Sequence, residues 1–244
     1  MWQEYFQLRE QFQKQPDLQT DIHKNYVRNL FLYETLKLSG TEMTLPEFEQ
    51  VINTGKSLHT PAQLKAYDLW QAWRYTERCA SQHLSIDARL IRNIAARIMK
   101  HTGGEITTTI GRYDSSLGDY RLGEDYNAVY SIADFRQIPE LMDALCRKVN
   151  VHLKEINITH LLKLAIDYLY AFAHIKPFGA GNPETSLISI NYLMLYHLQP
   201  LIVIFAEDRS QGLNALKSKN MNQTPEEFEN FILREQIKFL KQII

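Results

Sequence analysis

A short loop rich in glycine and proline carries the residues best suited to chemistry. It runs from Lys176 to Glu184 and reads Lys-Pro-Phe-Gly-Ala-Gly-Asn-Pro-Glu. Its glycines permit backbone angles that other residues avoid, and Asn182 before Pro183 is typical of a capped helix start. Backbone N–H groups at the positive end of a helix form a site for anions. The loop therefore predicts an anion or nucleotide site, or alternatively a capped turn that binds nothing, at Gly179, Gly181, Asn182, Pro183 and Glu184.

Two strongly apolar segments must position this loop. Residues 158–175 are apolar on nearly every face, and residues 183–198 repeat Leu, Ile and Met at helical spacing. A helix that is hydrophobic all round belongs in the interior of a domain. We therefore expect two central helices, joined by the 176–182 loop.

The rest of the chain predicts an all-α fold with one small β-hairpin. Thr44 with Glu47 and Thr224 with Glu227 form capping boxes at helix starts. The hairpin is expected within residues 105–131, with strands at 106–110 and 126–130, because β-branched residues and turn residues gather there. Residues 201–205 fit either a buried strand or a helix start. Further helices are expected at residues 1–14, 21–38, 45–54, 61–82, 85–99, 139–149 and 225–244.

Composition narrows the class of protein. The 244 residues have a net charge of −1, so no overall field attracts nucleic acid or an anionic membrane. The start of the chain lacks the basic and apolar runs of a signal peptide, and no apolar run is long enough to span a bilayer, so we expect a cytoplasmic protein. We expect one compact unit of three segments, at residues 1–60, 61–205 and 206–244.

Several stretches, in this order along the chain, resemble the Fic (Fido) family. The signature loop of that family runs His-Pro-Phe-x-Asp/Glu-Gly-Asn-Gly-Arg-x-x-Arg between two central helices, and residues 176–187 are similar to it. Residues 35–45 resemble the family's inhibitory segment, residues 111–113 the start of its flap, and residues 138–142 the helix that follows the flap. The resemblance implies a Fic-like core, with the hairpin as flap, that uses ATP and Mg²⁺ to transfer AMP to a hydroxyl of a target protein.

The functional positions of the family carry other residues in this chain. Ser39 stands at the position of the inhibitory Glu. Aligned without a gap, the loop has Lys176 for the catalytic His, Ala180 for the metal-binding acid, Pro183 for a Gly, Glu184 for the phosphate-binding Arg and Leu187 for the second Arg.

These replacements oppose the family's reaction. A lysine, with an ordinary pKa of about 10.4, is a poor base at neutral pH. Ala180 offers Mg²⁺ no oxygen, and Glu184 places negative charge beside the expected phosphates. Lys176 is therefore a catalytic residue by position only, and we expect no metal ligand in the chain. Binding of ATP and Mg²⁺ is implied by the resemblance alone.

His174 is a poor substitute for the missing base. It lies two positions before Lys176, so on a continuing helix it points about 200° away from that residue. We expect His174 in the core and Lys176 paired with a carboxylate.

Three hypotheses for function follow. The first is a Fic-like protein that is inactive or strongly impaired and acts as a binding or regulatory protein. The second is a nucleotidyl or phosphoryl transferase with altered chemistry, which uses Lys176 and the glycine-rich loop. The third is a helical interaction protein whose likeness to Fic is incidental. A protein or peptide partner is expected at the 105–131 flap by strand addition, and the sequence is compatible with a homodimer.

Overall fold

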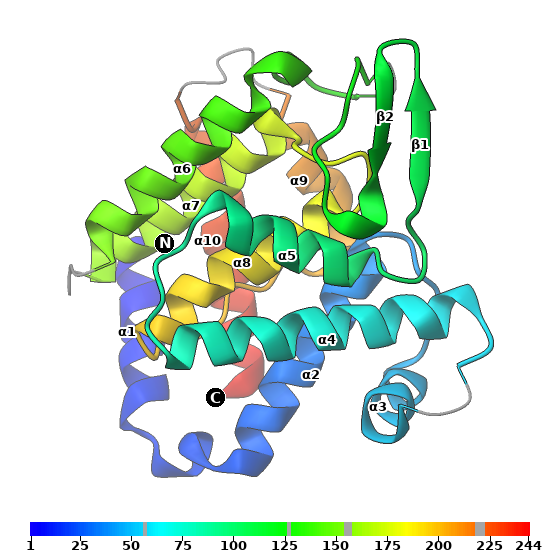
Figure 1. The fold of residues 1–244 in the computed structure, drawn as a ribbon. Coiled ribbons are helices and arrows are strands. Elements are labelled where there is room, and N and C mark those ends of the chain that lie inside the picture. Colours follow the sequence, from blue (N-terminus) through cyan, green and yellow to red (C-terminus); the bar gives the residue numbers. More distant parts are fainter. Residues whose placement is uncertain (56–57, 126–127, 154–157, 218–222) are drawn as a thin grey trace.

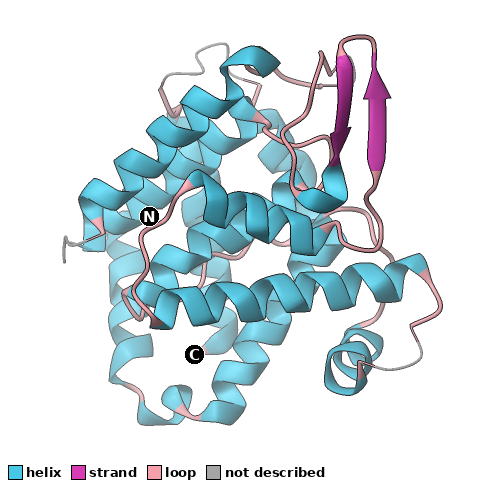
Figure 2. Ribbon diagram, viewed as in Figure 1, coloured by secondary structure: helices cyan, strands magenta, loops and turns pink. Residues whose placement is uncertain are grey.

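The chain folds into helices around a buried central pair, with one hairpin at the edge (Figures 1 and 2). The computed structural model describes residues 1–244 except 56–57, 126–127, 154–157 and 218–222. The α-helices and strands are α1 Trp2–Lys14, α2 Asp21–Leu38, α3 Leu45–Thr54, α4 Pro61–Ser81, α5 Ala88–Ile98, β1 Glu105–Thr108, β2 Gly111–Asp114, α6 Ile138–His152, α7 Ile158–Ile175, α8 Asn182–Tyr196, α9 Arg209–Ala215 and α10 Glu226–Ile243. In this described part of the chain, every helix is too short or too polar to cross a membrane.

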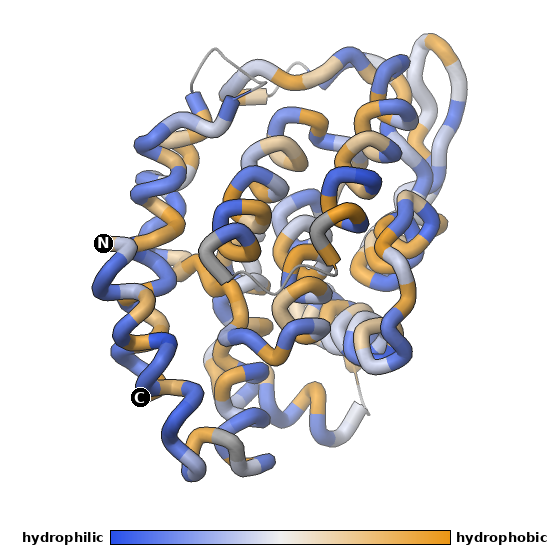
Figure 3. Tube along the Cα trace, turned by 90° about the vertical axis from the view of Figure 1, so that its left-hand side faces the viewer, coloured by the Kyte–Doolittle hydropathy of each residue, from blue (hydrophilic) through white to orange (hydrophobic). Residues whose placement is uncertain are grey.

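The expected central pair of helices is present as α7 and α8. Every residue of α8 from Glu184 to Met194 is buried, because α2, α4, α5 and α7 pack around it. The outer helices alternate hydrophobic and hydrophilic residues along their traces (Figure 3), as amphipathic helices do. The sequence prediction of an all-α fold with one hairpin is therefore confirmed.

The two ends of the chain pack against each other. The indole N–H of Trp2 on α1 donates to Glu229 on α10 at 3.0 Å. Lys241 near the end of α10 forms an ion pair with Glu4 at 2.7 Å. Figure 1 shows α1 beside α10. The first and last predicted segments thus meet in space, and the division into three segments stays a prediction.

One of the two expected capping boxes is wrong. At α3 the Thr44 hydroxyl accepts from the Glu47 N–H at 3.4 Å, and the Glu47 carboxylate accepts from the Thr44 N–H at 2.8 Å. At α10 the N-cap is Pro225 and no side chain caps the helix. The Thr224 hydroxyl instead donates to Asp167 on α7 at 2.7 Å. The Thr224 hydroxyl, which the sequence predicted to cap α10, is thus bonded to a carboxylate on another helix.

The hairpin is shorter than the sequence predicts. β1 pairs antiparallel with β2, with Glu105 opposite Asp114 and Thr108 opposite Gly111. The Thr108 hydroxyl closes the turn, since it accepts from the Ile110 N–H at 3.3 Å and donates to the Gly111 carbonyl at 3.0 Å. The second strand expected at 126–130 is wrong for residues 128–130, which form no strand, and residues 126–127 lie outside the described residues.

Residues 201–205 form neither of the two elements left open by the sequence. They are extended and largely buried, with side chains from neighbouring helices in place of a strand partner. The Asn191 amide accepts from the Ile202 N–H at 2.7 Å and donates to the Ile202 carbonyl at 2.9 Å. Gln236 donates to the Val203 carbonyl at 3.2 Å. The hydrogen bonds of this buried backbone thus depend on tertiary contacts.

Replacing Asn191 with Ala should destabilise the protein by about 2–4 kcal/mol, because a buried N–H and a buried C=O lose their partner. Urea unfolding followed by circular dichroism would measure the loss. Asn53→Ala, at an exposed position in α3, is the control and should change stability by less than about 0.5 kcal/mol. Equal losses for both variants would contradict this role of Asn191.

Candidate functional site

A cavity of about 600 Å³ lies at the N-terminus of α8. Ser39, Lys65 and Arg209 contribute to its walls, together with apolar residues of which Phe172, Phe228 and Phe231 are the largest. The loop residues predicted from the sequence also line it: Lys176, Gly179, Ala180, Gly181, Asn182, Pro183, Glu184 and Leu187. The fold therefore brings all the predicted site residues together around one space.

Asn182 holds the loop from within, but it is not the helix cap that the sequence predicts. Its side-chain oxygen accepts from the Phe178 N–H at 3.0 Å, and its side-chain N–H donates to the Phe178 carbonyl at 2.7 Å. The N-cap of α8 is Gly181, which has a φ of 72° and no side chain to cap with. Asn182 is the first residue of the helix, and its side-chain amide bonds both backbone groups of Phe178 in the loop.

The two glycines allow close packing around this turn. Gly181 takes the left-handed conformation at little steric cost because it lacks a Cβ. A Cβ at Gly179 would lie 2.3 Å from the Tyr113 hydroxyl oxygen, so glycine lets the end of β2 rest on the loop. The flap and the loop are thus fitted to each other.

Buried Arg121 joins the loop to the segment that follows the hairpin. The sequence analysis did not single out this residue. The Arg121 side chain is 3% exposed. Its guanidinium donates to the carbonyls of Lys176 at 2.8 Å, Gly123 at 2.8 Å and Ala133 at 2.6 Å. The Arg121 N–H also donates to the Pro177 carbonyl at 2.9 Å. Burial lowers the pKa of Arg121, while the acids Glu124 and Asp125 oppose this.

Lys176 pairs with a carboxylate, as expected. Its ammonium group forms an ion pair with Asp125, and both side chains are mostly buried. Its backbone has a φ of 45°, which is uncommon for a residue with a Cβ. The ammonium group is directed at Asp125, an arrangement that does not suit a general base for a hydroxyl in the cavity.

His174 lies in the core, as expected. Its Nδ1–H donates to the Ser131 carbonyl at 2.6 Å, and its ring packs against Tyr170 and Tyr130 with ring centroids 4.4 Å and 5.3 Å away. Burial lowers the pKa of His174, which favours the neutral imidazole. Its role in the described structure is to pin residues 131–133 to the end of α7.

Glu184 is buried at the first turn of α8. Its side chain is 8% exposed, and burial raises the pKa of this carboxyl. Its own N–H, the Ser39 hydroxyl, and the positive charges of Lys65 and Arg209 partly oppose that rise in pKa. The anion site predicted at this loop stays a prediction. The structure places the buried carboxyl of Glu184 on the cavity where that site was expected.

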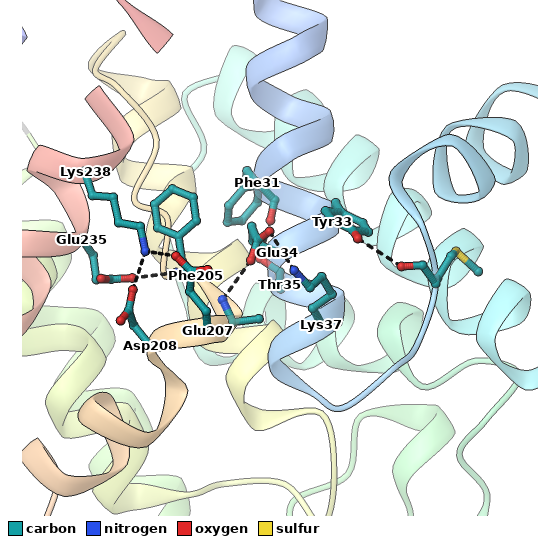
Figure 4. Close-up of polar contacts among 12 residues, drawn as sticks. Phe31, Tyr33, Glu34, Thr35, Lys37, Phe205, Glu207, Asp208, Glu235 and Lys238 are labelled. Carbon is teal, nitrogen blue, oxygen red and sulfur yellow. Dashed lines mark hydrogen bonds and ion pairs between the residues drawn. The ribbon is translucent and has the colours of Figure 1, made fainter. Parts of the chain in front are cut away.

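A group of acids fixes the segment that leads into α9, which forms one wall of the cavity (Figure 4). Glu34 on α2 accepts from the Ala206 N–H at 2.8 Å, and Glu235 on α10 accepts from the Phe205 N–H at 2.6 Å. Lys238 pairs with Glu207 and Asp208. Burial, with a smaller contribution from the nearby Asp208, raises the pKa of Glu235 to about 7. Two helices distant in sequence therefore hold the start of α9.

In the described part of the chain, His, Cys, Asp and Glu side chains form no group of three or more that could hold a metal ion. The ion pair of Lys176 and the buried carboxyl of Glu184 are the main polar features at the loop.

Comparisons with known proteins agree with this arrangement. The Fic/DOC family model matches residues 85–194, which include the hairpin, the loop and most of α8. The chain is 25% identical over 194 residues to the protein adenylyltransferase Fic of Drosophila erecta and 26% identical over 202 residues to that of Drosophila grimshawi, in each case over 78% of this chain. Residues 85–194 match the Fic/DOC family.

Solved structures support the Fic fold over the whole chain. A Fic domain containing signaling protein from Bacteroides thetaiotaomicron superposes with a TM-score of 0.76 at 18% identity, over 98% of this chain and 96% of that one. Fic-1 from C. elegans superposes with a TM-score of 0.74 at 15% identity, over 99% of this chain and 70% of that one. The aligned part of each Drosophila protein is only 36% or 37% of its length, so this chain spans about a third of those relatives.

Sequence reasoning missed four residues at or beside this candidate site, namely Lys65, Arg121, Asp125 and Arg209. Lys65 and Leu69 both line the cavity, and their spacing of four on a predicted helix is a signal that they share a face. Arg121 and Asp125 lie in a turn-rich segment without periodicity, and Arg209 follows a segment of ambiguous structure. No local pattern distinguishes these three from ordinary surface charges.

Arg121→Met should lower the free energy of unfolding by about 2–4 kcal/mol, because the carbonyls of Lys176, Gly123 and Ala133 lose the guanidinium that bonds them. Urea unfolding would measure the loss. Arg112→Met is the matched control in the flap, since the Arg112 side chain is 68% exposed and pairs with an exposed Glu105. The control should change stability by less than about 0.5 kcal/mol, and an equal effect of both variants would refute the role of Arg121.

The stability of the protein should fall as the pH rises from about 4.5 to about 7 through Glu235. Its pKa of about 7 in the folded state lies above its ordinary value of 4.5, so in this range the folded state binds a proton that the unfolded state releases. Melting temperatures at about pH 5 and about pH 7.5 would measure this slope. Glu235→Gln should flatten it.

Glu227→Gln, an exposed position on the same helix, is the control for that measurement and should keep the slope. A slope unchanged in Glu235→Gln would show that another group titrates.

Proposed function

We propose that this Fic-family chain does not transfer AMP and acts as a binding or regulatory protein. The observation that carries the proposal is the buried carboxyl of Glu184 on the cavity at the first turn of α8. The family resemblance places the phosphate-binding Arg at this position. A carboxylate there repels phosphate groups in a setting with little water to screen the charge.

The chain also lacks a suitable base. Lys176, at the position of the family's catalytic His, is an ion-paired ammonium group. The Nδ1–H of His174 is directed at the Ser131 carbonyl, and its ring packs between tyrosines. Neither side chain is arranged to take a proton from an attacking hydroxyl in the cavity.

The residues present do not fit ATP with Mg²⁺. Mg²⁺ is usually held by one or two carboxylates together with phosphate oxygens, and Ala180 supplies no oxygen at the position of the family's acid. The one acid on this turn, Glu184, is aligned with the phosphate ligand and not with the metal ligand. We therefore derive no step through Mg²⁺ or ATP.

A serine at the position of the inhibitory Glu agrees with this proposal. Ser39 lines the cavity and lies near Glu184, so the inhibitory segment still reaches the loop. It brings no carboxylate, and the loop offers no arginine for one to pair with. A site without transfer activity needs no such inhibitor.

A transferase with altered chemistry is the second candidate. Lys65, Lys176 and Arg209 all line the cavity, and cationic groups can stabilise charge that develops during phosphoryl transfer. The same measurement of AMP transfer and nucleotide binding separates the two candidates.

The hairpin is proposed as the place of a peptide partner. β1 pairs only with β2 in the described structure and lies at the outside of the molecule (Figure 1). An extended peptide can add to such an edge through backbone hydrogen bonds. Hydrogen exchange of the β1 amides should slow when a partner binds, and unchanged exchange with a bound partner would reject this edge. A cytoplasmic location and a homodimer stay predictions.

Incubation with labelled ATP, Mg²⁺ and cell lysate should give no labelled protein, and ATP should not shift the melting temperature. The protein adenylyltransferase Fic of Drosophila erecta serves as the positive control. Label transferred by the wild-type chain would refute the proposed function. A nucleotide-dependent shift without label would favour the second candidate over a site that excludes phosphates.

The variant Glu184→Arg tests whether the carboxyl of Glu184 is what prevents nucleotide binding. It should bring an ATP-dependent rise in melting temperature of about 2 °C or more, because ligand binding to the folded state stabilises it. Glu140→Arg, at an exposed acid in the first turn of α6 and outside the cavity, should not. If Glu184→Arg does not fold, Glu184→Gln removes the negative charge alone and should show a smaller rise.

A further inference from the structure

The Glu184 carboxyl has one oxygen without a partner. Glu184 is 8% exposed, and its Oε2 atom is buried without a hydrogen-bond partner in the described structure. Leaving such an oxygen unpaired is unfavourable by more than the usual gain from a hydrogen bond. A buried acid that lines a cavity and has a free acceptor oxygen indicates a ligand with an N–H or O–H donor.

The neighbouring hydroxyl does not serve this oxygen. Ser39 has one hydroxyl hydrogen, and that group donates to the Leu36 carbonyl at 2.7 Å. The cavity wall contains a second unsatisfied group, because the Thr102 hydroxyl oxygen is also buried without a partner among the described residues. Two unmet polar groups on one cavity favour a ligand with polar atoms at more than one point.

The charges on the cavity are of both signs. Lys65 and Arg209 line it, and both act on the charge of Glu184. Within the described residues, neither cation forms an ion pair with any carboxylate, Glu184 included. Lys176 differs, because Asp125 neutralises it. The polar part of the cavity thus presents one acid and two unpaired cations.

The remaining walls are apolar. Phe172, Phe228 and Phe231 lie on the cavity with leucines from α7 and α9. The volume of about 600 Å³ is within the range of sites for small organic ligands. These walls fit an aliphatic or aromatic body.

We propose that this cavity binds a small amphipathic zwitterion, namely an apolar α-amino acid or a short apolar peptide. The ligand's ammonium group donates to Glu184, and its carboxylate meets Lys65 and Arg209. Its side chain lies against the phenylalanines. This inference rests on the proposed function, since a binding protein with this loop needs a ligand other than a nucleotide.

The alternatives are less well matched to the walls. A nucleoside triphosphate brings several negative charges to Glu184. A simple amine has no group for the two cations, and a simple carboxylic acid leaves the Glu184 oxygen without a donor. The zwitterion satisfies both signs at once.

Isothermal titration calorimetry tests the proposal with three compounds that share a phenyl ring on a short alkyl chain and differ in their charged groups: L-phenylalanine, phenethylamine and 3-phenylpropionate. L-phenylalanine should bind at least about tenfold more tightly than either compound with a single charged group, because it alone makes both charge-assisted contacts. The dipeptide Phe-Phe separates the two sources of this chemistry. Tighter binding of the dipeptide assigns the site to peptides, and tighter binding of phenylalanine assigns it to the free amino acid.

Variants assign the two charges separately. Glu184→Gln should weaken binding of phenylalanine and phenethylamine by about tenfold and leave 3-phenylpropionate unchanged or tighter. Arg209→Gln should weaken phenylalanine and 3-phenylpropionate and spare phenethylamine. Arg209 is exposed, so its replacement should not disturb folding. Glu140→Gln, at an exposed acid away from the cavity, is the control and should leave the binding of all three compounds unchanged.

The proposal is overturned if phenylalanine and the dipeptide both fail to bind, if Glu184→Gln binds phenylalanine as tightly as wild type, or if the amine or the acid binds as well as the zwitterion. These outcomes leave the proposed function standing as long as labelled AMP is not transferred. Transfer of labelled AMP overturns the proposed function whatever the titrations show.

Discussion

The arrangement of the site depends on how the turn between α7 and α8 satisfies its backbone hydrogen bonds away from water. Asn182 bonds both backbone groups of Phe178, and Arg121 bonds the carbonyls of Lys176 and Pro177. Buried carbonyls need such partners, and a buried guanidinium with several acceptors is stable without a carboxylate next to it. Because both side chains are buried and each makes more than one hydrogen bond, the turn keeps a defined shape, and the side chains that follow it on α8 point to a defined place.

That defined place is a cavity whose electrostatics differ from those of a phosphate site. The first turn of α8 carries the positive end of the helix dipole, which stabilises the negative charge of a carboxylate at Glu184. Burial acts in the other direction and raises the pKa of the same group. The two effects thus oppose each other at the Glu184 carboxyl. The fold thus matches that of solved Fic proteins over nearly the whole chain, and an acid lines the cavity at its loop.

The wall formed by α9 depends on long-range polar contacts. Glu34 on α2 and Glu235 on α10 accept from successive N–H groups at Phe205 and Ala206. The N–H groups of a buried extended segment find no acceptors among the residues next to them in sequence. Acceptors must therefore come from the helices that pack on either side. Arg209, directly after this segment, owes its place on the cavity to these contacts.

Local sequence was sufficient for much of the fold. Hydrophobic periodicity placed α2 at Asp21–Leu38, and the Thr44 capping box placed the start of α3, because helix periodicity and capping involve residues within one or two turns. The apolar composition of α7 and α8 also predicted the central pair, and resemblance along the chain pointed to the Fic family. The loop residues around Lys176 and Glu184 were recognised for the same reason, since a glycine-rich turn before a helix is a local pattern.

Only the tertiary structure decided what those residues contact. Thr224 bonds Asp167 on α7 in place of its own helix, Asn182 bonds Phe178 in place of capping α8, and Lys176 pairs with Asp125 from the flap side. Arg121 and Arg209 reach the site from segments without periodicity. Asp167 and Asp125 are distant in sequence from the residues they bond, whereas Phe178 lies four residues before Asn182. In all three cases several possible partners compete for one polar group. Burial decides among them, because a buried group must be satisfied by whatever packing brings within reach.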